Sequence, residues 1–273
     1  MKTPTRKQRE KAKPDCTLAQ AGCGDAAGEA ILKLSLSGKR FVNHCDPEIR
    51  RLYWPLKRPI GLFSGMHMTS KGERTRNQVI ALTADLMNEQ GWLGVPISQV
   101  MAVSGLQKGG LYRHFESREA LAYAAFDHAV ARVRDRLIDS LTGCETATEQ
   151  LLALIHAYQP EDGPVPLPGG CPIMNVAIES DHAHPGLRER AVDAMSRWRS
   201  LIEQIVLDGM RRSELRKDID PANVSAVLIG GLEGGVMLSH LYDDPEPLQA
   251  AIRHLHHYVE HDLRRHAPED GTP

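Results

Sequence analysis

Apolar residues recur every three or four positions along the chain from residue 71 onward, which is the spacing of one face of an α-helix. Two neighbouring rows of this kind lie in residues 71–90: Val79, Leu82 and Leu86, then Ile80, Ala84 and Met87. Gly91 follows them, and glycine is typical of the position just after the last turn of a helix. The pattern therefore predicts a first helix that ends at Gly91.

The same periodicity predicts further helices separated by turn residues. Pro96 suits the first turn of a helix over 97–103, and Ser117 suits the N-cap of a long helix that reaches about residue 137. Between these two helices, residues 104–106 (Ser-Gly-Leu) form a tight turn before a short helix over 107–114. The remaining predicted helices cover 149–158, 172–179, 186–211, 221–242 and 247–263. Since no strand pattern follows residue 70, the sequence predicts an all-α fold.

The first 67 residues differ from the rest of the chain. They hold 13 Lys and Arg against 6 Asp and Glu, which leaves 20 against 29 in the remainder of a chain whose net charge is −2. Because this region has no sustained periodicity, we predict a basic, mostly disordered extension ahead of an acidic helical body. Met66 and Met68 are alternative start positions, so the residues before them are either a translation artefact or an added arm.

Several classes of protein do not fit this sequence. No apolar run approaches the 18 or so residues of a membrane span, and the charged N-terminus lacks the apolar segment of a secretory signal. The five cysteines are scattered without a CxxC pair, which is typical of reduced thiols in the cytoplasm. Motifs such as GxSxG, Walker or GxGxxG are missing in a suitable context. We therefore expect neither an enzyme nor a cofactor.

The stretch SGLQKGGLYRHFESREAL contains two adjacent glycines, although each costs a helix interior roughly 1 kcal/mol. A helix, a three-residue turn with glycine and a short helix make a helix-turn-helix, whose second helix enters the DNA major groove. Gly109 and Gly110 would let the helix backbone approach the phosphate-lined groove walls. Lys108 would meet a phosphate or a guanine edge, and Phe115 would anchor the short helix to the core.

Tyr112 and His114 each have a ring that can pack against the core and a polar atom at its tip. These polar atoms could hydrogen-bond to phosphate oxygens. The chain from 74 to 121 resembles the N-terminal domain of the TetR/AcrR family of one-component transcriptional regulators, most specifically in GLQKGGLYRHFESREAL. The resemblance implies phosphate contacts from Lys108, Tyr112 and His114, base contacts from the first turn of the helix, and a basic position at Arg118. The predicted DNA-binding residues are therefore Gln107, Lys108, Gly109, Gly110, Tyr112, Arg113, His114 and Arg118.

Two residues depart from the pattern of that family. Val95 and Pro96 stand where the family usually has Thr or Ser ahead of its second helix, so a side-chain cap is lost. Met101 occupies a position that is usually a small alanine facing the first helix, which implies local repacking. These changes affect the stability of the subdomain and leave the predicted DNA contacts in place.

In that family the C-terminal region dimerises through two long helices and encloses a ligand cavity. The predicted helices over 186–211 and 221–242 match this role. The second contains four glycines that permit close helix approach in a two-fold, four-helix interface: Gly230, Gly231, Gly234 and Gly235. The alternative is a merely flexible segment. A dimer also suits DNA, because two recognition helices one turn apart read a palindrome.

Cys171 is the candidate effector or sensor residue. It follows a Pro/Gly-rich loop over 159–170 and begins a predicted helix, where the macrodipole would lower the pKa of its thiol. It also resembles a glycine-cysteine segment of several TetR-type repressors, some of which sense electrophiles. The alternative is a small buried apolar residue. Cys144, in a predicted loop, is a candidate resolving partner.

Two groups of side chains have a spacing that would permit a metal ion: Glu179, Asp181, His182 and His184, and then His254, His257 and His261. No cysteine joins either group. A solvated polar helix face explains the spacing equally well, so we predict no metal site.

These observations predict four segments: the extension over 1–67, a helix-turn-helix DNA-binding domain over 68–117, a helical effector-binding and dimerisation domain over 118–266, and a tail over 267–273. The predicted protein is a cytoplasmic homodimeric repressor without membrane attachment. A small-molecule effector would release it from double-stranded DNA carrying a palindromic operator. The alternative is a DNA-binding protein of this fold that acts architecturally or through a protein partner, which a filled core without a ligand cavity would favour.

Overall fold

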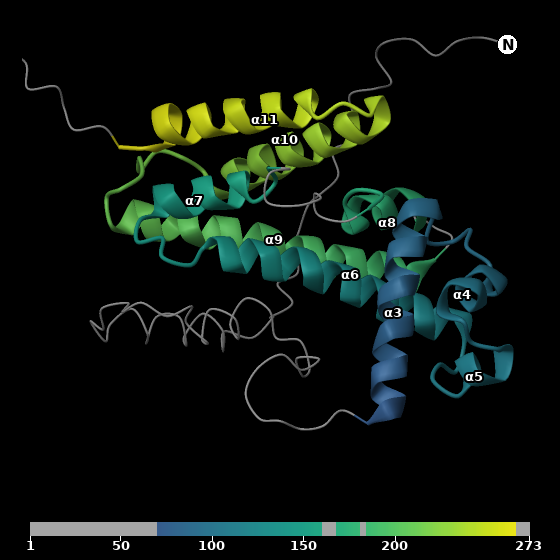
Figure 1. The fold of residues 1–273 in the computed structure, drawn as a ribbon. Helices are drawn as coiled ribbons and strands as arrows, with labels where there is room; N and C mark the ends of the chain where they lie inside the picture. The colour runs from purple at the N-terminus through teal and green to yellow at the C-terminus, as the bar shows by residue number, and fades with distance from the viewer. Residues whose placement is uncertain (1–69, 160–167, 181–183, 266–273) are drawn as a thin grey trace, which may run out of the picture. The chain divides into compact units, whose positions relative to one another are not determined.

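The computed structural model describes residues 70–159, 168–180 and 184–265, which form helices joined by turns (Figure 1). The elements are α3 (Lys71–Gln90), α4 (Ile97–Ser104), α5 (Lys108–Tyr112), α6 (Arg118–Ser140), α7 (Ala147–His156), α8 (Pro172–Ser180), α9 (Pro185–Arg211), α10 (Pro221–Tyr242), α11 (Glu246–His257) and the π-helical turn η3 (Tyr258–Leu263). These ranges contain no strand, only an isolated bridge between Leu215 and Arg264. The all-α prediction is confirmed, and the predicted helix ends lie close to the observed ones.

Side-chain caps explain where several helices begin. α3 starts with a capping box in which Ser70 and Glu73 each satisfy a backbone amide of the other, and it ends at Gly91 with a φ of 105°. Ser117 caps α6 by accepting from the amide of Ala120. The predicted loss of a cap before α4 is confirmed, because Pro96 offers no side-chain hydrogen bond there.

The first helices pack around a small apolar core that continues into α6. Leu111 of α5 and Phe115 after it are buried, so the predicted anchoring role of Phe115 is confirmed. Trp92, in the turn after α3, is fully buried and meets Phe126 of α6 edge-to-face with ring centroids 5.4 Å apart. This contact joins the helix-turn-helix to the long helix that follows it.

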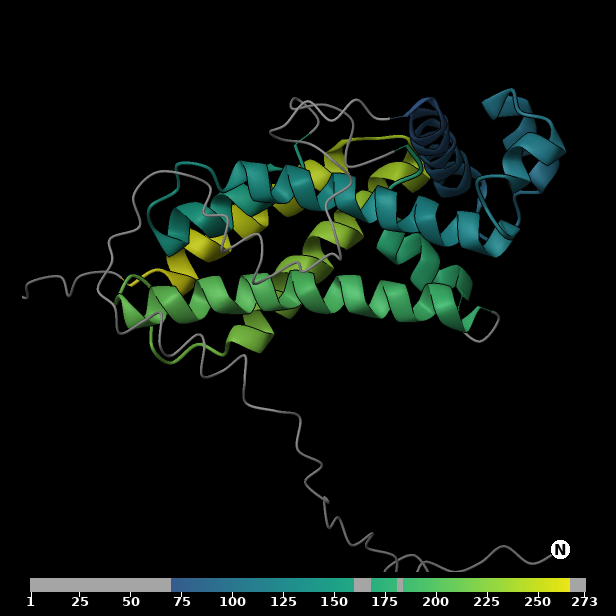
Figure 2. The ribbon, with the colours of Figure 1, turned by 90° about the horizontal axis from the view of Figure 1, so that it is seen from below.

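The remaining helices form a bundle in which α6 lies along α9 and α10 lies against both α9 and α11 (Figures 1 and 2). Glycine makes the α10–α11 contact close. A Cβ added at Gly231 would lie 3.1 Å from Leu255, and one added at Gly235 would lie 3.0 Å from Ala251. Two of the four glycines that were predicted to serve a dimer interface therefore serve packing within the chain.

One sequence expectation about apolar runs is wrong. By length and composition, α10 could cross a membrane. It is the one helix of this kind in the part of the chain that the structure covers. Its glycines interrupt the run of large apolar side chains that would mark such a helix in the sequence. The helix also packs within the protein. Of its most apolar stretch 44% is buried, and Glu233 lies in the middle of the helix. A helix of a protein core passes the same test.

Some predictions fall on residues outside the described ranges. These are the extension over 1–67, the tail over 267–273, most of the loop over 159–170, and the metal candidates Asp181 and His182.

Candidate DNA-binding and effector sites

The turn of the helix-turn-helix depends on Gly105. This residue ends α4 in the left-handed conformation with a φ of 69°, which a side chain would strain. The chain then enters α5 at Lys108. Leu111 turns inward, and its carbonyl accepts hydrogen bonds from the amides of His114 and Phe115. The short helix is therefore held from its inner side, and its other residues face away from the core.

The exposed surface of α5 carries most of the predicted DNA-binding residues. Lys108 and Arg113 are exposed, and within the described ranges neither side chain has a hydrogen-bond or ion-pair partner. Tyr112 is 41% exposed, and His114 is half-buried. A Cβ added at Gly109 would have nothing within 4 Å. The helix thus presents two unpaired cations beside a bare stretch of backbone, as close contact with an anionic groove requires.

A further cation lies next to this surface and was not assigned from the sequence. Arg76 of α3 places its guanidinium 5.1 Å from the centre of the Phe115 ring. Phe115 directly follows His114, so Arg76 adds positive charge at the end of the recognition helix. Its position on the first helix, far from the GLQKGG motif in sequence, gave no signal of this contact.

Arg118 differs from the other predicted DNA-binding residues. Its guanidinium donates hydrogen bonds to the backbone carbonyls of Val95 at 2.8 Å and Leu93 at 2.9 Å. These carbonyls belong to the turn between α3 and α4. The side chain is therefore engaged in holding the helix-turn-helix onto α6, and the geometry gives no support to a DNA contact from Arg118.

Glu179 of α8 holds the same turn from its other side. Its carboxylate accepts hydrogen bonds from the amides of Trp92 at 2.7 Å and Leu93 at 3.2 Å. As a candidate metal ligand Glu179 is thus already used within the fold. Between them, Arg118 binds the carbonyls and Glu179 the amides of one turn, which fixes the helix-turn-helix to two helices of the C-terminal region.

Asn88, near the end of α3, makes a second connection to the C-terminal region. Its side-chain amide donates to the carbonyls of Pro168 at 2.7 Å and Gly170 at 2.9 Å. Gly169 between them has a φ of 84°, and an added Cβ would lie 2.3 Å from the Asn88 carbonyl oxygen. The turn before α8 is therefore packed directly onto α3. This helix is the first of the three helices α3, α4 and α5, which together form the reading head. No motif predicted this connection.

Cys171 lies at the start of α8, as predicted, but its environment is the opposite of the expected one. The residue is 1% exposed, and burial raises the pKa of its thiol well above the usual range. The amides of Met174 and Ile173 lower the pKa, as a helix start should, yet this effect is the smaller one. The expectation of an accessible, acidic thiol is wrong. Cys144 is free and partly exposed, and burial raises the pKa of its thiol too.

Cys171 belongs to a buried polar cluster that the sequence did not reveal. Glu233 of α10 is 7% exposed, and burial raises the pKa of its carboxyl to about 7 while the Cys171 thiol opposes the rise. The Tyr158 hydroxyl, after α7, is buried as well. Neither the hydroxyl nor the two carboxyl oxygens has a nitrogen or oxygen hydrogen-bond partner in the described ranges, which leaves the weak Cys171 thiol as the donor beside Glu233. Buried polar groups in proteins are rarely left in this state.

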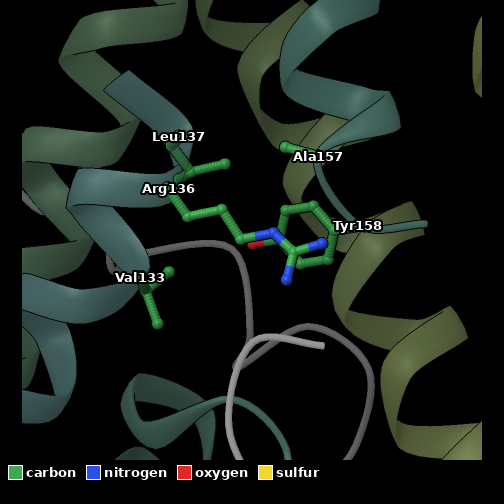
Figure 3. A pocket seen from close by; sticks show the side chains of 5 residues that line it. All are labelled: Val133, Arg136, Leu137, Ala157 and Tyr158. Carbon is green, nitrogen blue, oxygen red and sulfur yellow. The ribbon is translucent and has the colours of Figure 1, made fainter. Parts of the chain in front are cut away.

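The surroundings of Tyr158 are tightly filled. Its ring stacks on Trp198 of α9 with centroids 6.1 Å apart. On the side of α6, Arg136 reaches towards the ring (Figure 3). Its guanidinium donates to the Gln159 carbonyl at 3.2 Å. The hollow among the side chains in Figure 3 has no room for a water molecule.

An exposed apolar stripe follows the outer face of α10. Its members recur at helical spacing, and most are large exposed apolar side chains: Val227, Gly230, Gly234, Met237, Leu238 and Leu241. An added Cβ at Gly230 or Gly234 would meet nothing within 4 Å. Val192 and Leu207 of the neighbouring α9 are also exposed. These two helices therefore leave an exposed apolar surface. At Gly230 and Gly234 no side chain projects from it, so another helix could approach the backbone closely.

In the described residues, the histidine side chains do not form a metal-binding site. Rings of His257 and His261 lie 4.1 Å apart, and His156 stacks on His256 at 5.2 Å. Among the residues that the structure covers, no group of three or more His, Cys, Asp or Glu side chains is placed to hold a metal ion.

Family models match both halves of the described chain. Residues 79–125 match the model of bacterial regulatory proteins of the tetR family, and residues 147–255 match the tetracyclin repressor-like C-terminal domain. The first match contains the whole helix-turn-helix, and the second contains Tyr158, Cys171 and Glu233.

Individual proteins agree with these models. A crystal structure of a TetR transcriptional regulator from Chloroflexus aurantiacus is 41% identical, with a TM-score of 0.69, over 72% of this chain and 99% of that one. The HTH-type transcriptional regulator LmrA of Bacillus subtilis is 26% identical over 64% of this chain and 90% of its own. The HTH-type transcriptional repressor DhaR of a Mycobacterium is 21% identical over 63% and 86%. The protein belongs to the TetR family of DNA-binding transcriptional regulators.

Proposed function

We propose that this protein is a homodimeric repressor that binds a palindromic operator through α5 and releases it when a small effector enters the C-terminal helical domain. The exposed cations Lys108 and Arg113 beside the bare backbone at Gly109 carry the proposal. In this arrangement Gln107 contacts a base edge, while Lys108, Tyr112 and His114 contact phosphates. Arg76 adds a phosphate contact from α3, and Arg118 supports the geometry from behind.

Dimerisation follows from the apolar stripe on α10 and the exposed apolar residues of α9. Two such helices from each subunit would pack as a four-helix interface, with Gly230 and Gly234 allowing close approach. Two copies of α5 would then be related by a two-fold axis, which matches the symmetry of a palindromic operator.

The domain limits of the proposal are a helix-turn-helix domain over 68–117 and an effector and dimerisation domain over 118–266. The extension over 1–67 and the tail over 267–273 lie outside both. DNA binding requires the compartment of the chromosome, so we propose a cytoplasmic location without membrane attachment. Removal of residues 1–67 should leave the thermal midpoint nearly unchanged, as differential scanning calorimetry would show. A truncated chain that fails to fold would refute these limits.

The second candidate function does not involve an effector. In it, a DNA-binding protein of this fold acts architecturally or through a protein partner. The filled hollow beside Tyr158 favours this second function. The unpartnered Glu233 and Tyr158 favour an effector, since a ligand would supply the missing hydrogen bonds. Cys171 is a sensor candidate only in a state that exposes its thiol, and its burial favours a packing role.

Selection from random double-stranded DNA with the purified full chain tests the proposal. We expect an enriched palindrome whose half-sites lie one helical turn, or a multiple of it, apart. Gly230→Glu should give a monomer in light scattering and lose operator affinity, while Ala250→Glu, on the exposed face of α11, should leave both unchanged. Enrichment of a non-palindromic sequence, or a Gly230→Glu protein that stays dimeric, would refute the dimeric repressor.

A further inference from the structure

The polar cluster at Glu233 is a feature that DNA binding and dimerisation do not use. Glu233 projects from α10 into the core, away from the exposed stripe of the same helix. Its carboxyl oxygens have no nitrogen or oxygen partner in the described ranges. The weak thiol donor of Cys171 is the group that acts on the carboxyl and lowers its pKa. The Tyr158 hydroxyl approaches from α7 and is equally unpartnered. A protein that leaves three such oxygens in its core gains stability from any molecule that donates hydrogen bonds to them.

We propose that Glu233 and Tyr158 form the recognition site for a small organic cation, an ammonium group on an apolar body. An ionised carboxylate only accepts hydrogen bonds, so its partner must be a donor, and a cationic donor also neutralises the buried charge. The apolar body suits the surroundings of Tyr158, whose ring stacks on Trp198. This inference rests on the proposed effector control and gives the chemical class of the effector.

The groups that face Glu233 leave its charge uncompensated. Burial raises the pKa of Tyr158 and of Cys171 well above their usual values, so both are neutral near pH 7. Arg136 acts on Tyr158, whose pKa it lowers, and its guanidinium is held at the Gln159 carbonyl. Burial is also the main cause of the raised pKa of Glu233. Among the residues that the structure describes, no cation acts on the pKa of Glu233, so a ligand cation would supply the positive charge that this carboxyl lacks.

The position of the site connects ligand binding to the reading head. The hollow at Tyr158 is filled, so a ligand must displace side chains to enter. Cys171 beside Glu233 begins α8, and the preceding turn touches both sides: Gly170 lies against Val236 of α10, and Gly169 lies against Asn88 of α3. Movement of this turn would shift α3, and with it the recognition helix.

Matched probes on the full chain test the site without DNA. Phenylbutylamine supplies the cation, while phenylbutanol and phenylbutyrate keep the apolar body but carry a neutral or negative head. We expect only the amine to raise the thermal midpoint and to change Trp fluorescence, because Trp198 stacks on Tyr158. Its affinity should fall about thirtyfold in Glu233→Gln and less in Tyr158→Phe. Glu246→Gln, at an exposed glutamate of α11, is the control and should bind as the native protein does.

The pH dependence of amine binding provides a second readout. The amine stays cationic between pH 6 and 8, whereas the ionised fraction of Glu233 rises about tenfold over this range because its pKa is about 7. Affinity should therefore increase about tenfold from pH 6 to pH 8. Calorimetry in buffers of different ionisation enthalpy should show release of about half a proton at pH 7, and this release should vanish in Glu233→Gln.

Equal effects of amine and alcohol, or unchanged amine affinity in Glu233→Gln, would overturn the site. Operator binding separates this inference from the proposed function. Amine binding that leaves operator affinity unchanged would support the site and refute effector control by it. A palindromic operator bound by a protein that ignores the amine would support repression and refute the site.

Discussion

The reading head and the core of the C-terminal domain both hold unpaired charge, but in opposite settings. Lys108 and Arg113 are cations on an exposed surface, where water solvates them. Glu233 is an acid that burial has removed from water, so its charged form is disfavoured and its pKa rises to about 7. An exposed unpaired charge costs the fold little, whereas a buried one reduces stability until a partner arrives. The two regions therefore respond differently to substitution, to salt and to pH.

The connection between the two regions is where substitution should have the largest effect. Gly169→Ala would place a Cβ 2.3 Å from the Asn88 carbonyl oxygen at a residue whose φ is 84°. We expect a loss of about 3 kcal/mol or more of unfolding free energy, or about 10 °C in thermal midpoint. Gly143→Ala is the matched control, because its φ is 85° but nothing lies within 4 Å. Similar midpoints for the two variants would show that the turn does not press on α3.

The buried acid should make stability depend on pH. Folded Glu233 keeps its proton up to about pH 7, whereas the unfolded chain releases it near 4.5, so the folded form binds more protons between these values. Stability therefore falls as pH rises from about 4.5 to the folded pKa of about 7, and the loss is complete above that pH. Glu233→Gln removes this loss and should be more stable than the native protein by roughly 3 kcal/mol at pH 8. Below pH 4.5 the difference should disappear, and urea unfolding at both pH values measures it. A variant that is less stable at pH 8 would show that the carboxylate has a partner.

The sequence was informative where function depends on local order. The spacing of Gly105, Lys108, Gly109 and Phe115 lies within one short segment, so periodicity and turn chemistry were enough to predict the helix-turn-helix. The helix start at Ser117 follows the same local rules.

The cluster at Glu233 escaped the sequence because its members come from three helices. Tyr158, Cys171 and Glu233 are each ordinary in their own segment, and only tertiary packing brings them together and excludes water. The error at Cys171 has the same origin. The helix start acts on its pKa in the predicted direction, but the extent of burial cannot be inferred from one segment, and burial is the larger effect. Arg118 likewise has a basic side chain at a plausible DNA-facing position, yet three-dimensional contacts direct it to the turn at Val95.

The exposed cations should respond to salt, which the buried acid should not. Lys108→Ala removes an unpaired cation from α5 and should weaken binding to all DNA by about 1 kcal/mol at physiological salt. The slope of log affinity against log salt should fall by about one phosphate contact. Lys217→Ala, an exposed lysine between α9 and α10, is the control and should change neither quantity. An unchanged salt slope in Lys108→Ala would place the recognition surface elsewhere.

The smallest effect should come from Tyr112, whose ring and hydroxyl have separate roles. The side chain is 41% exposed, and among the described residues its hydroxyl has no hydrogen-bond partner, so Tyr112→Phe leaves no buried group unsatisfied and should not change the thermal midpoint. Loss of one neutral hydrogen bond to a phosphate should weaken operator binding by about 0.5–1 kcal/mol. The salt slope should stay the same, because no charge is removed. Fluorescence anisotropy across a salt series distinguishes this variant from Lys108→Ala. A steeper loss than in Lys108→Ala would mean that the hydroxyl reads a base edge rather than a phosphate oxygen.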